Sequence, residues 1–129
     1  MRVRGAEPPE ADVARQRAVV DAFLAASREG DFDALVALLD PDVVLRADRA
    51  VVRTGAVEEV RGAAAVAATF SGRARGARPA LVDGAAGAVW APAGQPRVVF
   101  DFIVAGGRIT DIELLADPEH LARLELVLP

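Results

Sequence analysis

A long β-hairpin that runs into a helix start constrains the fold of this chain most. Two runs rich in β-branched and aromatic residues, 97–105 and 108–115, flank Gly106 and Gly107. Glycine accepts the positive φ that a tight two-residue turn requires. The second run leads to Asp117 and Pro118, where the aspartate can cap free amides and the proline suits a first helical position. The end of the chain therefore predicts a hairpin followed by a helix that begins at Pro118.

The first half of the chain predicts three helices. Gly30 separates the first two, Asp31 caps the second, and Pro41 ends it because the residue before a proline disfavours helical backbone. A third, alanine-rich helix is expected over 63–70, opened by Gly62. The apolar positions at helical spacing are Val13, Val20, Phe23 and Leu24 in the first helix and Leu35, Leu38 and Leu39 in the second.

Several short apolar runs predict strands. Residues 43–45 begin one strand, which Val51 and Val52 continue or pair with, and residues 80–82 and 88–90 form a hairpin around a loop at 83–87. Helices followed by consecutive hairpins indicate an α+β fold in which a curved antiparallel sheet wraps around about three helices. We expect residues 1–10 to form an extended leader or linker and residues 11–129 to form one domain.

Composition limits the chemistry that the chain can perform. The 129 residues include no Cys and one His, so we expect no metal and no cofactor. All 15 basic residues are Arg, which together with the abundant Ala suggests a GC-rich genome such as that of an actinobacterium. Since neither a signal peptide nor an apolar run long enough to cross a bilayer is present, the prediction is a cytoplasmic protein without membrane contact.

The charge pattern argues against nucleic-acid binding. The net charge is −4 and the pI is about 5.0, although seven arginines fall between positions 46 and 78. A nucleic-acid binder of this size would carry a net positive charge and more aromatic residues. We therefore expect the arginines to be solvated or to pair with acids, and we expect no direct contact with nucleic acid.

Asp101 is the candidate for catalysis. If Ala105 faces Arg108 across the turn, strand alternation places one set of side chains on a single face: Val99, Asp101, Ile103, Thr110, Ile112 and Leu114. With Trp90, these residues would line an apolar pocket in which burial raises the pKa of Asp101 and suits it to acid–base chemistry. The favoured interpretation is a structural carboxylate paired with an arginine such as Arg97 or Arg46, and catalysis by Asp101 is the alternative. For His120, a partner contact or helix capping is the favoured interpretation over catalysis.

Two segments carry a family resemblance. Residues 23–35 and the Gly107, Arg108, Ile109 turn with its strands resemble the SnoaL-like branch of the nuclear transport factor 2-like superfamily. That resemblance implies a cone-shaped α+β domain. Since related isomerases, dehydratases and polyketide cyclases enclose a pocket in the cone, it leaves open a stand-alone enzyme or a module that binds an apolar small molecule. The chain has no Tyr for isomerase-type stabilisation of an enolate.

A narrower resemblance covers about residues 13–126. Residues 40–48, 82–87 and 116–121 together resemble the SnoaL-like C-terminal domain of a group of extracytoplasmic-function RNA polymerase sigma factors. The resemblance implies a regulatory domain whose partners are the sigma regions of its parent chain and RNA polymerase. The chain contains no sigma regions, so we expect either a fragment of such a protein or a stand-alone relative.

The residues of this regulatory interface follow from two signatures of the sigma-factor group. An Asn-Pro-Asp-Lys-Leu signature corresponds here to Asp117, Pro118, Glu119, His120 and Leu121, and a second signature to Asp48 and Arg53. Proteins of this fold often dimerise through the open face of the sheet, so the resemblance also implies either a homodimer or a contact of that face with the sigma regions.

Overall fold

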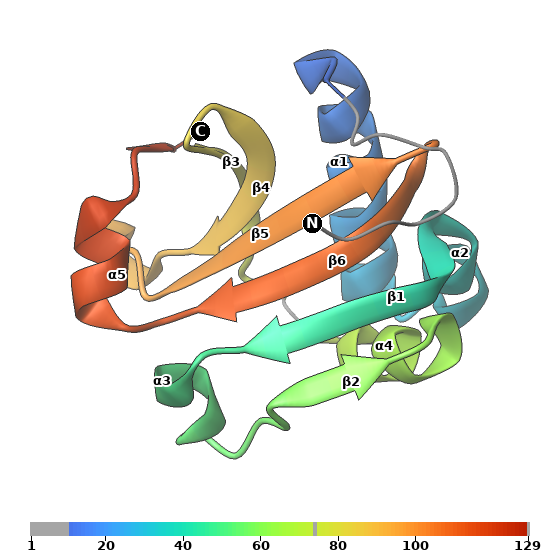
Figure 1. Ribbon diagram of the computed structural model, residues 1–129, viewed down its shortest axis with the longest axis horizontal. Helices are drawn as coiled ribbons and strands as arrows, with labels where there is room; N and C mark the ends of the chain where they lie inside the picture. The colour runs from blue at the N-terminus through green and yellow to red at the C-terminus, as the bar shows by residue number, and fades with distance from the viewer. Residues whose placement is uncertain (1–10, 74, 129) are drawn as a thin grey trace.

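The computed structural model describes residues 11–73 and 75–128, in which a seven-stranded sheet wraps around the helices of an α+β fold (Figure 1). The expected leader at 1–10 lies outside the described residues. No helix in the described part has both the length and the apolar character to cross a membrane. The helices are α1 Val13–Glu29, α2 Phe32–Leu38, α3 Arg49–Val52, α4 Ala63–Phe70 and α5 Pro118–Arg123, with a 3-10 turn at Pro92–Gly94. The strands are β1 Leu39–Ala47, β2 Glu59–Arg61, β3 Arg78–Val82, β4 Ala85–Trp90, β5 Val98–Ala105, β6 Arg108–Leu115 and β7 Leu126–Val127.

The expected helix boundaries are confirmed at most ends. Gly30 terminates α1 with a φ of 70°, and the Asp31 carboxylate caps α2 by accepting a hydrogen bond from the amide of Ala34 at 3.2 Å. The expected end of α2 at Pro41 is wrong, because the chain enters β1 at Leu39. Leu39 is paired with Ile109 of β6, so strand pairing takes over before the proline is reached.

The strand order is β2-β1-β6-β5-β4-β3-β7. The prediction of an antiparallel sheet holds for five of its neighbouring pairs, but β1 runs parallel to β6, so the sheet is mixed. The consequence is that the carboxyl ends of β1 and β6 meet at the same edge of the sheet (Figure 1). Residues that follow these two strands are thereby brought together.

Two local expectations are corrected. Val51 and Val52 form the short helix α3 instead of a strand, because the Asp48 carboxylate accepts a hydrogen bond from the amide of Val51 and starts a helical turn. The loop expected at 83–87 is only two residues long. Asp83 and Gly84 both have positive φ, 49° and 83°, which suits a tight hairpin turn and lets β4 begin at Ala85.

The register of the last hairpin differs from simple alternation. Ala105 faces Arg108 as expected, but Val104 pairs with Ile109 and Ile103 pairs with Asp111, which leaves Thr110 as an extra residue. A single inserted residue moves every later side chain of the strand to the other face. The expectation that Ile112 and Leu114 share a face with Asp101 is therefore wrong.

The inner face of the sheet packs against α1, α2 and α4 (Figure 1). Four phenylalanines fill the centre of the cone. The ring centroid of Phe23 lies 5.1 Å from that of Phe70 and 5.5 Å from that of Phe102, and Phe70 lies 6.4 Å from Phe100. The two pairs that involve Phe23 are edge-to-face, and such pairs stabilise a core beyond the burial of their area.

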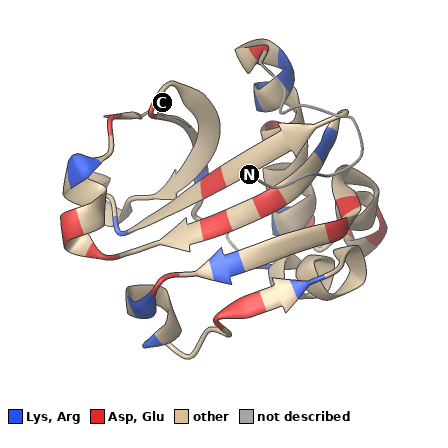
Figure 2. Cartoon of the chain, in the orientation of Figure 1, with Lys and Arg blue, Asp and Glu red and all other residues tan. Residues whose placement is uncertain are grey.

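The outer face of the sheet has two halves. Over β3, β4 and β5, the residues of α5 and β7 cover a second apolar cluster that includes Val89, Val99 and Leu115. In the other half, charged residues lie in neighbouring strands, β1, β2, β5 and β6 (Figure 2). On that half, Arg46 contacts both Glu59 at 3.4 Å and Asp111 at 3.7 Å.

Candidate functional site

Asp48 joins two segments that are far apart in the sequence. Its Oδ1 accepts the amide of Val51 at 3.0 Å and starts α3, while its Oδ2 accepts the amides of Ala116 at 2.8 Å and Asp117 at 2.9 Å. The backbone amide of Asp48 donates to the carbonyl of Leu114 at 3.0 Å. One carboxylate therefore fixes α3 to the segment that enters α5.

These hydrogen bonds change the acidity of Asp48. Burial raises its pKa and is the largest single effect, but hydrogen bonds from the backbone amides of Asp117, Val51, Ala116 and Ala50 together outweigh it and lower the pKa. Amides donate to the ionised carboxylate and so stabilise it. Asp48 is thus held as an anion whose oxygens are occupied by the backbone.

Helix α5 begins as the sequence predicted, with Pro118 in its first turn. The cap expected from Asp117 is wrong, because its side chain makes no capping bond. Asp48 holds the entry to this helix by accepting the backbone amide of Asp117. Leu121 packs against the outer apolar cluster. His120 is half-buried in the same helix.

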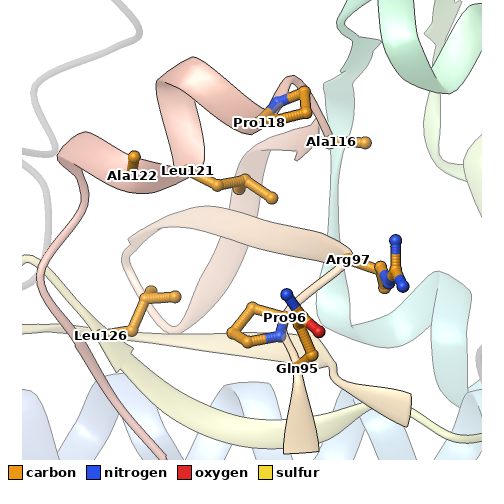
Figure 3. A pocket seen from close by; sticks show the side chains of 8 residues that line it. All are labelled: Gln95, Pro96, Arg97, Ala116, Pro118, Leu121, Ala122 and Leu126. Carbon is orange, nitrogen blue, oxygen red and sulfur yellow. The ribbon is translucent and has the colours of Figure 1, made fainter.

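A groove of about 320 Å³ lies between α5 and the segment that leads into β5 (Figure 3). Pro118, Leu121 and Ala122 contribute one wall, and Pro96 and Leu126 face them. Gln95 and Arg97 supply polar groups. The helix that the resemblance marked as an interface thus borders a groove of mixed polarity with a guanidinium group in its lining.

A second hollow, of about 610 Å³, lies beside α3 and is lined by Ala47, Asp48, Arg49, Val52, Arg53 and Glu58. Arg49 and Arg53 are one helical turn apart, and both are exposed. Neither forms a salt bridge with any residue that the structure describes. Asp48 forms no salt bridge with either arginine, and its oxygens accept backbone amides.

The structure brings the seven residues expected at a regulatory interface to one end of the molecule, where α3 and α5 flank the ends of β1 and β6 (Figure 1). Asp48 and Asp117 are in direct contact. Sequence reasoning did not find Arg49 or the segment 95–97, and it did not predict that the two signatures meet. The parallel pairing of β1 with β6 was the missing information, since it aligns their carboxyl ends.

Asp101 lies on the outer face of the sheet, directly opposite Glu113 and away from the phenylalanine cluster. Burial, followed by the negative charges of Glu113 and Asp83, raises its pKa, and the charge of His120 opposes this. The expected rise in the pKa of Asp101 is confirmed, but this carboxylate lies on the outer face of the sheet beside like charges. The enzyme hypothesis had placed this carboxylate inside an apolar pocket.

The other residues expected to line one pocket are dispersed. Val99 lies in the outer apolar cluster under α5, whereas Ile112 lies in the inner core and Ile103 is 40% exposed on the outer face. Trp90 is 44% exposed and borders a separate hollow of about 300 Å³ with Phe100. Leu114 packs beside the inner core. The predicted pocket around Asp101 therefore does not form.

Polar groups are scarce in the core. Among residues 11–73 and 75–128, the buried polar or charged side chains are Ser27, Thr110 and Asp111, and the last two are hydrogen-bonded to each other at 2.9 Å. The inner core itself is formed by apolar side chains. Within this part of the chain, no group of three or more His, Cys, Asp and Glu residues is arranged to hold a metal ion.

Comparison with solved structures identifies the fold. An NTF2-like protein of unknown function from Burkholderia xenovorans superimposes with a TM-score of 0.55 and 21% identity, over 81% of this chain and 85% of its own. The chain has an NTF2-like fold. A likeness to an LEH-like epoxide hydrolase from Mycobacterium tuberculosis, with a TM-score of 0.54 and 21% identity over 81% of this chain and 84% of the enzyme, concerns the fold alone.

Another solved structure matches this chain with higher identity. The extracytoplasmic function sigma factor SigJ of Mycobacterium tuberculosis superimposes with a TM-score of 0.63 and 27% identity over 81% of this chain. The match spans 43% of SigJ, so this chain corresponds to less than half of that protein. No protein-family model and no curated protein matches the sequence.

Proposed function

We propose that this NTF2-like domain regulates an extracytoplasmic-function sigma factor to which it is attached. In this proposal it modulates transcription initiation in the cytoplasm by contacting the sigma regions of its parent chain and RNA polymerase. Residues 11–129 are the regulatory domain and residues 1–10 the linker. The observation that carries the proposal is the Asp48 carboxylate, which joins the two signature segments into one surface.

The similarity to part of SigJ supports this assignment, since SigJ is itself an extracytoplasmic function sigma factor. The surface is also suited to a protein partner. Arg53, Pro118 and Glu119 are exposed, and α3 and α5 are held in a fixed relation by Asp48. A surface ordered before binding loses less conformational entropy when the partner docks.

The outer face of the sheet is better suited to the sigma regions than to a second copy of this chain. Asp101 lies opposite Glu113 on that face. Two copies docked through these residues would bring like charges together, which is unfavourable across an interface. We therefore assign the face to a different partner.

The first experiment reads the genomic DNA upstream of the Arg2 codon in frame and expresses the complete product. If two sigma regions precede the domain, run-off transcription with core RNA polymerase is compared for the full protein and for one that ends before residue 11. We expect removal of residues 11–129 to change transcript yield at least threefold. A reading frame without sigma regions, or an unchanged yield, would overturn the proposal.

A pair of charge reversals tests the proposed surface. Arg53→Glu combined with Glu119→Arg reverses the charge of two exposed side chains without altering the net charge. Arg53 directly follows α3, and Glu119 lies in α5. The matched control, Arg28→Glu with Glu29→Arg, reverses two exposed side chains at the end of α1. We expect the first pair alone to abolish regulation while both proteins stay folded by circular dichroism. Leu121 is unsuitable for this test because it packs on the outer apolar cluster.

A further inference from the structure

A further hollow lies on the inner side of the sheet, apart from the α5 groove, the hollow beside α3 and the hollow beside Trp90. Its volume is about 360 Å³, within the range of small-molecule sites. The loop between α3 and β2 and the helix α4 border it, with strands β1, β2 and β6 behind. Its lining is formed by Leu45, Gly55, Ala56, Val57, Val60, Ala68, Thr69, Arg73 and Leu114.

The walls of this hollow are apolar. Leu45, Val60 and Leu114 come from the sheet and pack against the inner core, while Ala68 comes from α4. Val57 stands in the loop and is 66% exposed, the highest exposure among the large apolar residues that the structure describes. An aliphatic group placed in the hollow would cover this side chain and gain the free energy of burying it.

The polar groups of the lining favour an anion. The hydroxyl of Thr69 donates to the carbonyl of Ala65 at 2.9 Å and is thereby satisfied. Arg73 is exposed and makes no salt bridge with any described residue. It is the one charged side chain in the lining, and a guanidinium group binds a carboxylate through two parallel hydrogen bonds.

We infer that this hollow binds a small aliphatic carboxylate. The hydrocarbon part packs against Val57, Ala68 and Leu114, and the carboxylate pairs with Arg73. The lining holds no carboxylate, histidine or other side chain that could act as a general acid or base near neutral pH, so we infer binding without conversion of the ligand. The inference is independent of any attachment to sigma regions.

The test uses octanoate as the probe and octan-1-ol as its uncharged counterpart, with the whole 129-residue chain. Titrations are followed by the NMR shifts of assigned methyl groups. We expect octanoate to shift the methyls of Val57, Ala68 and Leu114 in a saturable manner and octan-1-ol to bind more weakly. Absence of saturable shifts, or shifts confined to residues around Trp90, would overturn the inference.

Matched substitutions locate the two parts of the site. We expect Arg73→Gln to raise the dissociation constant of octanoate about threefold to fivefold while leaving that of octan-1-ol unchanged. Arg75→Gln is the control, because Arg75 lines the Trp90 hollow instead. Val57→Asp should abolish octanoate binding, whereas Val127→Asp, at a 56% exposed position on β7, should not. Equal effects within either pair would contradict the assignment.

Discussion

On the inner face of the sheet, Phe100 and Phe102 of β5 pack against phenylalanines of α1 and α4, while Asp101 between them faces the opposite way and lies across from Glu113. The inner face is apolar and closely packed. The outer face combines an apolar half covered by α5 with a half that carries charges. Adjacent residues of one strand therefore pack in the core on one side of the sheet and form a polar surface on the other.

Different interactions stabilise the inner face and the end of the molecule that carries α3 and α5. The inner face depends on burial of large apolar side chains, each of which stabilises the fold by several kcal/mol. The end of the molecule that carries α3 and α5 depends on one carboxylate and a small apolar cluster. The candidate interface is therefore the part of the molecule that the substitution of a single polar residue can loosen.

Removal of a ring from the inner core should produce the largest loss. Phe23→Ala deletes the side chain that contacts both Phe70 and Phe102, and we expect the free energy of unfolding to fall by about 3–5 kcal/mol. Urea denaturation measures it. Phe32→Ala, at a 39% exposed position, is the control and should cost about 1 kcal/mol or less. Similar losses in both variants would mean that the phenylalanine cluster is not the centre of the core.

Loss of the Asp48 carboxylate should have the next largest effect. Asp48→Ala leaves the amides of Val51, Ala116 and Asp117 without their acceptor, and we expect a cost of about 2 kcal/mol at neutral pH. Asp31→Ala removes a carboxylate that caps α2 through Ala34 and should cost about 1 kcal/mol. Hydrogen exchange should rise at α5 in the first variant only.

The effect of Asp48 should also depend on pH. Because the pKa of Asp48 is lowered in the folded state, its contribution is complete above the pKa of the unfolded chain and is lost as pH falls through the folded pKa. Urea denaturation of the native protein and Asp48→Ala should therefore converge at acidic pH. A difference that stays constant down to pH 2 would contradict the role assigned to the carboxylate.

The smallest effect is expected on the charged half of the outer face. Asp101→Asn removes the like-charge contact with Glu113, and we expect a gain of about 0.5 kcal/mol at neutral pH. Because the folded pKa of Asp101 is raised, the native residue is favoured below the unfolded pKa and loses that advantage as pH rises through the folded value. The gain should therefore vanish in acid. Glu58→Gln, at an exposed loop position, should change stability by less than about 0.3 kcal/mol at either pH.

Local signals predicted much of this molecule. Gly30 and Asp31 fixed the break between α1 and α2, and Pro118 fixed the start of α5, because caps and breakers act through their immediate neighbours. Alternation failed after Thr110, since a bulge depends on the partner strand and leaves no mark in the sequence of its own strand. That one residue decided on which side of the sheet the predicted pocket residues fell.

The sequence by itself determined the longer helices, the two hairpins and many of the apolar positions that fill the core, because these follow from backbone preferences and periodicity over a few residues. Only the tertiary structure decided that β1 runs parallel to β6 and that Asp48 therefore reaches the amides of Ala116 and Asp117. Asp48 and Ala116 are separated by 68 positions in the sequence, and no local preference favours their contact. It exists because strand pairing across the whole sheet brings the ends of two distant strands together.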